Sequence, residues 1–537
     1  MSGDLSEKRT ANFELRDRVN PGIRTLGIAL NHPKVRTSLA MFGMALIFLA
    51  FLSKVQFSTD DLAGVDGYYH IRFASLMRTE GIKPGFPWLP LTILNPREFS
   101  DHHLLFHIAL IPFTLGDLRQ GAKIAAVVFP CMAFLCIWWL LRAQRVPYSA
   151  LWSLGLLAVS EAFIFRMSLV RRQSLTLAVM ALGLHWMLTK KYTRLIPLGF
   201  VFVWIYDAFP VLMALATFYV AAVLLVERRL ELRPLIYCGL GVTLGLVINP
   251  YFPNDIVFAI RHLAPKLTET TTLDVGNEWY PYQTSTLLKN SPLTLIAFFS
   301  GVFALGLRER RMETRTAASL LVALLFGFLL FQSRRFIEYF PPFALIFAAF
   351  AWSPLLEVQE VSRDDRELPT SRFRMLMNSI PGVSLRQVMA VAVLLVFLIP
   401  GAWLTMRDAQ KSVKSSRPYT LFAGASAWLK ANTPAGARVF QTDWDDFPRL
   451  FYYNTHNTYL VGLDPTYMHL YNADLYDLWE KITEGNVERP SQYIYDRFGA
   501  NYVVSDLNHK DFIRRAEEDP GLKEVYRDEE AVVYAFK

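Results

Sequence analysis

The chain has 537 residues, of which 53% are hydrophobic and only 19% charged, and its formal net charge is +8. Soluble globular chains average about 45–50% apolar and about 25% charged residues, so this composition argues against a soluble protein. The apolar excess lies in long blocks, which indicates an integral membrane protein, and there a basic balance reflects cytoplasmic loop charge rather than nucleic-acid binding. The three cysteines lie in apolar runs without metal-ligand spacing, so neither a disulfide framework nor a zinc site is predicted.

The N-terminal segment, residues 1–37, is polar with mixed charge, and the apolar block after it lacks a signal-peptide cleavage site. A transmembrane domain of about eleven spans is predicted to follow over 38–409. The apolar blocks that define these spans are 38–54, 120–141, 149–165, 174–189, 195–207, 208–226, 234–252, 291–307, 316–332, 336–355 and 388–406. The stretch 104–115 is shorter than the ~17 residues that a span needs, so it predicts an interfacial or re-entrant helix.

Basic residues in the connections give the predicted orientation. With a cytoplasmic N-terminus, every cytoplasmic connection carries arginine or lysine, as the positive-inside rule requires. The loops 55–119 and 253–290, and the chain from 410 to 537, then lie on the periplasmic or extracytoplasmic side. Residues 410–537 contain Pro and Gly turn signals, strand-like runs at 500–504 and 531–536, and an amphipathic stretch, which together predict an external α/β domain.

The first external loop contains GVDGYYHIRFAS, which places Asp66 and His70 just beyond the first span. A carboxylate kept at the membrane surface beside aromatic rings and a histidine is a candidate general base or metal ligand, and an Asp-Gly turn is the alternative. Further along the same loop stands the run Asp101, His102 and His103. It suits contact with a metal or a substrate, although Asp101 is also a good N-cap for the helix that follows.

Arginines on the external side depart from the usual charge bias. Arg171 and Arg172 lie in RMSLVRRQ between two spans, and Arg334 and Arg335 lie in QSRRFIEYFPPF at the end of another. They either anchor lipid headgroups or bind an anionic substrate, and the guanidinium fork suits phosphate.

Three further carboxylates lie on the same side. Asp207 falls between two apolar blocks, where a carboxylate is either functional or part of the turn. Glu278 lies in DVGNEWYPYQ of the second external loop, and Glu338 follows Arg335 at a spacing that permits an ion pair. Carboxylates, histidines and arginines gathered at one membrane face fit sugar transfer from a polyprenyl-linked phosphosugar. Transporters instead place their charges near the bilayer midplane in repeated halves.

Three motifs resemble those of the catalytic subunits of oligosaccharyltransferases, within the GT-C class of membrane glycosyltransferases. DGYYHIR (66–72) is similar to the family's acidic motif in the first external loop. VGNEWYP (275–281) is similar to its external-loop motif, a Glu followed three residues later by Pro, and RRFIEYFPP (334–342) is similar to its Arg-Phe-x-x-Tyr pattern. The long first external loop and the external C-terminal domain also match the family's organisation.

The resemblance implies roles for particular residues. Asp66 would be a catalytic residue in the metal and acceptor site, and Glu278 would contact the acceptor. Arg335 would bind the phosphate of the lipid-linked donor, with Arg334, Arg171 and Arg172 as further donor-phosphate residues.

Two departures from the family pattern concern the metal and the acceptor. The family's second loop supplies another metal carboxylate, but RMSLVRRQ has no acid. We predict that Asp101 and His103 complete a set with Asp66 for Mg²⁺ or Mn²⁺; the alternative is a site without metal. DWDDF (443–447) retains only Trp444 and Asp445 of the WWDYG motif, with which the family holds the Ser or Thr of a sequon, and these two are the predicted acceptor-binding residues.

The sequence therefore predicts a membrane glycosyltransferase of oligosaccharyltransferase type. It would move a glycan from a polyprenyl-(di)phosphate donor to an extracytoplasmic acceptor, for which a protein is one candidate. The nearest alternative is a GT-C transferase that uses a polyprenyl-monophosphate sugar and a lipid or polysaccharide acceptor. A more distant alternative is a non-enzymatic lipid flippase or transporter.

Overall fold

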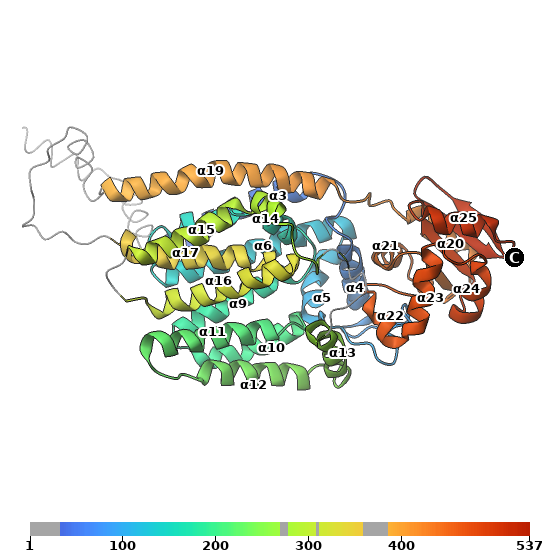
Figure 1. Cartoon of the computed structure of the whole chain (residues 1–537), viewed down its shortest axis with the longest axis horizontal. Coiled ribbons are helices and arrows are strands. Elements are labelled where there is room, and N and C mark those ends of the chain that lie inside the picture. The colour runs from blue at the N-terminus through green and yellow to red at the C-terminus, as the bar shows by residue number, and fades with distance from the viewer. Residues whose placement is uncertain (1–32, 269–275, 277, 308–310, 358–384) are drawn as a thin grey trace, which may run out of the picture. The chain divides into compact units, whose positions relative to one another are not determined.

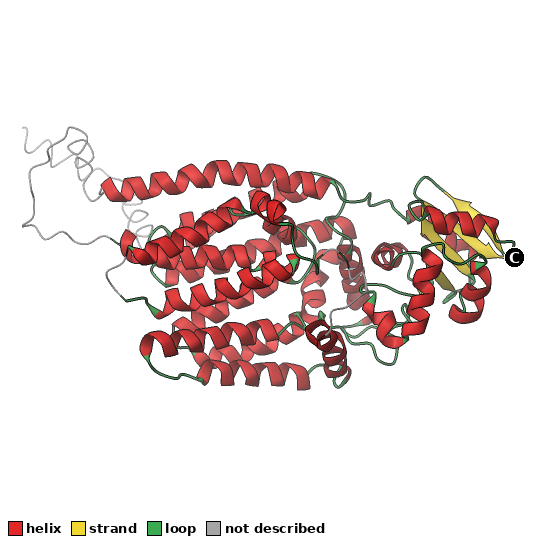
Figure 2. Cartoon of the chain, in the orientation of Figure 1, coloured by secondary structure: helices red, strands yellow, loops and turns green. Residues whose placement is uncertain are grey.

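The computed structural model describes residues 33–268, 276, 278–307, 311–357 and 385–537, so most of segment 1–37 and of the predicted loop 356–387 lies outside it. The described chain is mostly helical and carries a small five-stranded sheet (Figure 2). It divides into two compact units, residues 1–50 and 51–537. The first contributes the start of α3 (Pro33–Gln56), and the features below lie in the second.

Helices form over the apolar blocks. They are α6 (Leu118–Ala143), α9 (Gln173–Leu188), α10 (Leu195–Ile205), α11 (Pro210–Glu227), α12 (Arg233–Val247), α15 (Pro292–Gly306), α16 (Thr314–Gln332), α17 (Phe340–Leu356) and α19 (Leu385–Lys414) (Figure 1). Among the described residues, five helices are long and apolar enough to cross a membrane, or seven if two bent pairs each count as one span. These helices support an integral membrane protein. The count of about eleven spans stays a prediction, because α9, α10, α12 and α17 are shorter.

Glycines let α10 and α12 pack closely. A Cβ atom on Gly241 would lie 2.2 Å from the carbonyl oxygen of Ile196, and one on Gly199 would lie 2.8 Å from that of Cys238. Small residues allow van der Waals contact between helix backbones in a membrane, where the hydrophobic effect does not drive helices together. Side chains larger than hydrogen at these glycines would separate the pair.

The predicted span 149–165 is not one straight helix. The segment Ser149–Leu157, which contains α7 (Ser149–Leu154), meets α8 (Glu161–Met167) at 83°. The new helix begins after Ser160, because the hydroxyl of this serine accepts the N–H of Phe163 at 3.1 Å and caps the first turn. The apolar composition of the block carries no signal for this bend apart from the Ser160 cap.

Backbone groups freed by the bend find partners on α15 and α19. The carbonyl of Val159 accepts both the N–H and the hydroxyl of Thr294, at 3.1 and 2.9 Å, and the carbonyl of Ala158 accepts the hydroxyl of Thr405 at 3.1 Å. Backbone polar groups at membrane depth must be satisfied within the protein, so these hydrogen bonds stabilise the bend. The bend turns α8 so that Arg166 reaches residues far along the chain.

The loop 55–119, predicted to be external, is largely folded. It contains α4 (Asp66–Glu80), which packs against α6 and against α21 (Phe447–Tyr453). The stretch 104–115, predicted as an interfacial or re-entrant helix, forms α5 (Leu104–Leu110) and a 3₁₀ turn through Thr114. The second loop contains α13 (Asn254–Thr268) and α14 (Thr284–Asn290).

The sheet is formed by the last hundred residues. Its strands are β1 (Arg438–Gln441), β2 (Thr458–Tyr459), β3 (Tyr502–Asp506), β4 (Leu522–Arg527) and β5 (Ala531–Phe536). Their order is β2-β1-β3-β5-β4, with β1 parallel to β2 and β3, and β5 antiparallel to β3 and β4. The strand-like runs of the sequence thus form β3 and β5, and the amphipathic stretch forms α23 (Ala473–Thr483).

Both faces of the sheet are covered, and successive side chains serve opposite faces. Val504 packs with α20 (Ala423–Asn432), with α21 and with the loop around Trp88, whereas Val503 packs with α23, α24 (Pro490–Phe498) and α25 (Lys510–Glu518). Trp88 also donates its indole N–H to the carbonyl of Thr455 at 2.9 Å and accepts the N–H of Tyr459 at 2.8 Å. The loop 55–119 is therefore part of the core that the sheet buries.

Exposed positions allow the predicted orientation to be tested. Tyr495 on α24 is 58% exposed, and Leu230 between α11 and α12 is 60% exposed. We expect a membrane-impermeant maleimide added to intact cells to label Tyr495→Cys and to leave Leu230→Cys unlabelled until the cells are opened. The parent protein, whose cysteines are buried or half-buried, is the blank. The reverse labelling pattern would contradict both the orientation and an external site.

Candidate active site

Asp66 begins helix α4 and is bound by an arginine from another segment. Its carboxylate lies 2.7 Å from Nη2 of Arg171, which stands in the connection between α8 and α9. An acidic residue in the first turn also suits the helix dipole. Asp66 is therefore both a helix-start residue and a member of a longer ionic network.

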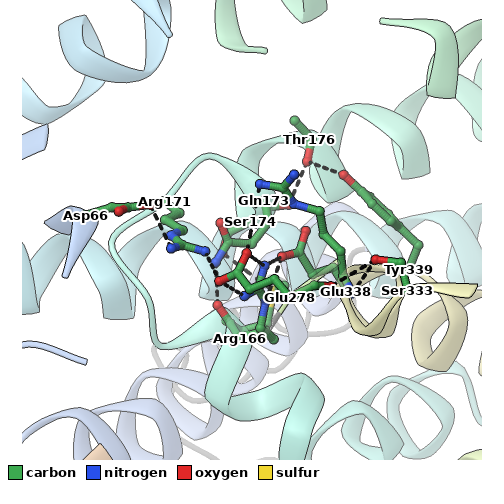
Figure 3. Close-up of polar contacts among 12 residues, drawn as sticks. Asp66, Arg166, Arg171, Gln173, Ser174, Thr176, Glu278, Ser333, Glu338 and Tyr339 are labelled. Carbon is green, nitrogen blue, oxygen red and sulfur yellow. Dashed lines mark hydrogen bonds and ion pairs between the residues drawn. The ribbon is translucent and has the colours of Figure 1, made fainter. Parts of the chain in front are cut away.

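Glu278 is the centre of that network, which comprises Asp66, Arg166, Arg171, Glu278, Arg335 and Glu338 and is called the Glu278 network below. Figure 3 labels all of these residues except Arg335. Nη1 of Arg166 and Nη1 of Arg171 both lie 2.6 Å from Oε1 of Glu278, and Nη2 of Arg335 lies 3.9 Å from Oε2. Arg166 also donates from Nε to Glu338 at 2.8 Å. Glu338 thus pairs with a residue of α8, not with the neighbouring arginines suggested by the sequence.

Backbone contacts hold the loop of Glu278 in place. The carbonyl of Glu278 accepts the hydroxyl of Ser333 at 2.9 Å and the N–H of Arg335 at 3.2 Å, and the carbonyl of Tyr280 accepts the N–H of Arg334 at 3.0 Å. This pairing fixes the loop that carries Glu278 to the 3₁₀ turn η4 (Arg334–Glu338). The VGNEWYP and RRFIEYFPP motifs therefore meet in space.

The carboxyl group of Glu278 is ionised. Burial alone would raise its pKa, but the charges of Arg166, Arg171 and Arg335 act against burial and hold the pKa well below the usual value. An ionised carboxylate shared by arginines costs less to bury than an isolated one, and removal of Glu278 would leave the charges of Arg166 and Arg171 without this compensation.

Arg172 and Arg335 project into a polar cavity of about 60 Å³. Its remaining lining consists of Asp66, Tyr69, His70, His102, His103, Asp207, His262, Leu463, Asp464 and Tyr467. Arg172 lies over the ring of Tyr206 at 4.2 Å and Arg335 over that of Trp279 at 4.5 Å, so each guanidinium is oriented by an aromatic face. The cavity brings two arginines predicted to bind phosphate together with Asp66.

Arg334 lines neither this polar cavity nor the smaller one between Arg166, Arg171, Arg172 and Arg335. Its Nε donates to the carbonyl of Pro281 at 3.2 Å, and its guanidinium lies 5.3 Å from the ring centroid of Tyr282. The structure therefore separates the two adjacent arginines: one faces the cavity, and the other supports the loop.

The histidine side of the cavity is buried and hydrogen-bonded. Asp101 accepts the N–H of His103 at Oδ1 (3.0 Å) and contacts Nδ1 of His107 through Oδ2 (2.8 Å). His107 in turn lies 2.8 Å, through Nε2, from Nδ1 of His70. His107 was not singled out in the sequence, where it is one polar residue within LLFHIALIPFTL; its spacing of four residues from His103 was the available signal.

Comparison with known proteins gives a match only by structure. No family model matches the chain, and no curated protein matches it by sequence. The apo oligosaccharyltransferase of Archaeoglobus fulgidus is similar with a TM-score of 0.61 at 14% identity, covering 93% of this chain and 74% of that one. ArnT of Cupriavidus metallidurans bound to undecaprenyl phosphate is similar with a TM-score of 0.55 at 15% identity, and the match covers 94% of this chain and 98% of ArnT. The mycobacterial arabinofuranosyltransferase AftD is similar with a TM-score of 0.51 at 15% identity, and the match covers 92% of this chain and 40% of AftD.

All three are GT-C glycosyltransferases. The chain has the GT-C fold. The resemblance to oligosaccharyltransferases stated from the sequence is thereby confirmed for the fold, which extends over more than nine-tenths of the chain.

The predicted metal set does not come together within this GT-C fold. Across the described residues, no three His, Cys, Asp or Glu side chains gather closely enough to hold a metal ion. Asp66 is bound by Arg171, and both oxygens of Asp101 lie against nitrogens of His103 and His107. Asp66, Asp101 and His103 therefore do not fit a divalent cation as arranged, although the A. fulgidus enzyme has been solved as a complex with Zn and sulfate.

Trp444 lies beside the loop that carries Glu278. A Cβ atom on Gly276 would be 3.5 Å from Cζ2 of Trp444, so the DWDDF segment borders the loop that carries Glu278. Asp445 and Asp446 lie in a cluster of carboxylates, and Asp446 is only 2% exposed. Burial, and then the charges of Asp443 and Asp445, raises the pKa of Asp446 well above its usual value.

Asp445 gives a pH-dependent test. Burial, reinforced by the charge of Asp443, raises its pKa to about 6, against about 3.9 in an unfolded chain. The folded state then binds this proton more tightly, so stability falls as the pH rises from about 4 to about 6 and stays lower above that range. We expect Asp445→Asn to be more stable than the parent at pH 7.5, by about 1–2 kcal/mol, and the difference to shrink at pH 4.5.

Thermal unfolding in detergent at the two pH values measures this difference. Asp496→Asn, at an exposed aspartate of α24, is the matched control and should change neither midpoint. A gain for Asp445→Asn that is larger at pH 4.5 than at pH 7.5 would contradict the raised pKa.

Proposed function

We propose that the protein is a membrane glycosyltransferase of oligosaccharyltransferase type, which moves a glycan from a polyprenyl-(di)phosphate donor to an acceptor on the extracytoplasmic side. The observation that carries this proposal is the polar cavity, which Asp66, Arg172 and Arg335 line together. A leaving phosphate requires cationic groups at one wall, and an attacking acceptor requires hydrogen-bond acceptors at another; this cavity offers both.

Donor binding rests on the arginines. Arg172 and Arg335 are the cavity's guanidinium groups, and Arg171 reaches the same region through Asp66 and Glu278. Planar guanidinium groups bind phosphate oxygens in a bidentate manner, and the aromatic rings behind them restrict their orientation. Solved relatives by fold have been determined with dolichol-phosphate and with undecaprenyl phosphate, which supports a polyprenyl-phosphate ligand.

An apolar cavity of about 340 Å³ suits the hydrocarbon chain of such a donor. It adjoins the bend before α8 and is lined by residues such as Gly155, Val159, Ile296, Leu345 and Phe397. These residues come from the segment Ser149–Leu157, the bend that follows it, α15, α17 and α19. Apolar walls of this kind bind apolar chains without specific polar contacts.

The acceptor side of the proposal uses Asp66 and Glu278 at the reaction site and Trp444 and Asp445 beside it. The A. fulgidus enzyme has been solved with an acceptor peptide tethered to it, which is consistent with a protein acceptor for this fold. No step is assigned to a divalent cation here, because the residue contacts do not fit one. Restoration of activity by Mg²⁺ or Mn²⁺ after chelation would reinstate the cation predicted from the sequence.

A second candidate is a transferase that uses a polyprenyl-monophosphate sugar and a lipid or polysaccharide acceptor. Two observations favour it: the chain covers 98% of ArnT but 74% of the oligosaccharyltransferase, and DWDDF keeps only part of the WWDYG motif. Transfer assays with diphosphate and monophosphate donors separate the two candidates. Absence of transfer with either donor, together with lipid movement across vesicles, would support the flippase alternative.

Replacement of Asp66 tests the reaction site. We expect Asp66→Ala to retain less than about a tenth of the parent rate of sugar transfer, a loss of more than about 1.4 kcal/mol of transition-state stabilisation. Glu80→Ala, at the exposed end of the same helix, is the control and should transfer at the parent rate. Retention of more than a tenth of the rate in Asp66→Ala would leave Asp66 as a helix-start residue only.

Arg335→Lys tests the donor site. Lysine keeps the charge but lacks the planar fork, so we expect donor affinity to fall by about 1–3 kcal/mol, as for the loss of charge-assisted hydrogen bonds. Titration with a polyprenyl-phosphate analogue measures this. Arg334→Lys is the matched control, because Arg334 lies outside the polar cavity and its replacement should leave donor affinity unchanged. Equal losses in both variants would instead support the sequence prediction that both arginines bind the donor.

A further inference from the structure

Three buried side chains form a hydrogen-bonded chain that ends at the polar cavity. Oδ2 of Asp101 lies 2.8 Å from Nδ1 of His107, and Nε2 of His107 lies 2.8 Å from Nδ1 of His70. His70 and Asp101 are 3% exposed and His107 is fully buried. His70 stands one helical turn after Asp66 on α4, and both residues line the cavity.

The carboxylate end of this chain determines which nitrogens carry hydrogen. A carboxylate only accepts hydrogen bonds, so a neutral His107 carries its one proton on Nδ1, and its Nε2 is then a lone pair. His70 must then donate from Nδ1 to that lone pair. In a neutral His70 the other nitrogen, Nε2, consequently has no hydrogen and is the nitrogen left for the cavity.

His70 is held neutral by its surroundings. Burial is the largest cause that lowers its pKa well below the usual value, and neighbouring cations and imidazoles lower it further. The groups that lower it beside burial are His107 of α5, Arg172 and Arg171 between α8 and α9, and His102 in the loop before α5.

His103 presents a second lone pair to the same cavity. Its Nδ1 lies 2.8 Å from the carbonyl oxygen of His102, and a carbonyl only accepts, so Nδ1 carries the hydrogen. Burial lowers the pKa of His103 well below its usual value, which leaves the ring neutral and Nε2 bare. One side of the cavity therefore offers hydrogen-bond acceptors, and the other offers the guanidinium groups of Arg172 and Arg335.

We propose that Nε2 of His70 accepts the proton of the acceptor group that attacks the sugar, and that His107 and Asp101 are positioning residues that hold His70 in this tautomer. This inference rests on the proposed function and names the residue that receives the proton. An oxygen or nitrogen lone pair of the acceptor forms the bond to the anomeric carbon, and the bond from that carbon to the phosphate oxygen breaks, its electron pair going to the phosphate. The proton of the attacking O–H or N–H group moves to Nε2. The carboxylate of Asp101 stabilises the resulting positive charge on His70 through His107.

The arrangement also selects the kind of acceptor. Lone pairs on His70 and His103 and the carboxylate of Asp66 bind groups that donate hydrogen bonds, and they repel anions. The attacking group is then a neutral hydroxyl or amide rather than a carboxylate or a phosphate.

Asp101→Asn is the decisive variant, because its amide can lie only one way. The backbone N–H of His103 is a fixed donor that requires the amide oxygen, so the amide NH₂ must face Nδ1 of His107. His107 then accepts at Nδ1 and donates from Nε2, and His70 is forced to carry its hydrogen on Nε2. We expect kcat to fall by about 10²–10⁴-fold, as for loss of a general base, while affinity for a polyprenyl-phosphate analogue stays within twofold of the parent.

Nitrogen NMR of ¹⁵N-histidine protein reads the tautomer without any substrate. The signals of His70 are identified as those lost in His70→Phe. In the parent, Nε2 of His70 should carry no hydrogen, and in Asp101→Asn it should be protonated. His70→Phe keeps the ring shape and should also lose turnover by at least 10²-fold with normal donor affinity, which covers the case in which Asp101→Asn does not fold. His185→Gln, at a buried histidine of α9 outside the cavity, is the matched control and should retain the parent turnover.

Two results would overturn the proposal. One is a parent protein in which Nε2 of His70 carries the hydrogen. The other is turnover within about threefold of the parent, either in His70→Phe or in an Asp101→Asn protein in which Nε2 of His70 is shown to carry the hydrogen. A parent protein that transfers no sugar but has the expected tautomer would contradict the proposed function and the catalytic use of His70, and would leave the hydrogen-bonded chain intact.

Discussion

The site depends on ion pairs in which carboxylates from distant segments compensate the positive charges of neighbouring arginines. Arg166 and Arg171 would repel each other if they were brought together alone, and Glu278 compensates for both at 2.6 Å. Asp66 and Glu338 extend the same compensation to α4 and to η4. The loops 55–119 and 253–290, the bent helix and η4 are joined by a few charged groups, so the geometry of the cavity follows from electrostatics as much as from packing.

The bend before α8 makes the ion pairs of Arg166 possible. A straight helix over 149–165 would leave no short helix in a new direction to carry Arg166. Ser160 caps the new helix, while Thr294 and Thr405 satisfy carbonyls that the bend exposes. Hydroxyl side chains in the apolar helices thus determine where a charged side chain of the site is placed.

Composition and motif were sufficient for the helical membrane class and for several members of the site. Asp66, Arg172 and Arg335 could be predicted as site residues because charges near a membrane are costly and tend to be functional, and the three do line one cavity. Other features depended on contacts that sequence spacing does not encode. Glu338 was within pairing distance of Arg335 along a helix, yet it binds Arg166, which is 172 residues away. Asp101 looked like a metal ligand or a helix cap, and only the fold reveals that its second oxygen faces His107.

The enclosure of Trp88 by the C-terminal sheet affects the order of events during synthesis. Trp88 contacts Thr455 and Tyr459, and Phe86 and Phe99 share the same buried cluster with Val504 and Val533. At a synthesis rate of roughly 5–20 residues per second, roughly 20–90 s separate the synthesis of Trp88 from that of the last strand of the sheet. During that interval the aromatic side chains of the first loop lack their final cover and are open to wrong pairing. The exposure of these side chains therefore ends only when the last strands have been made.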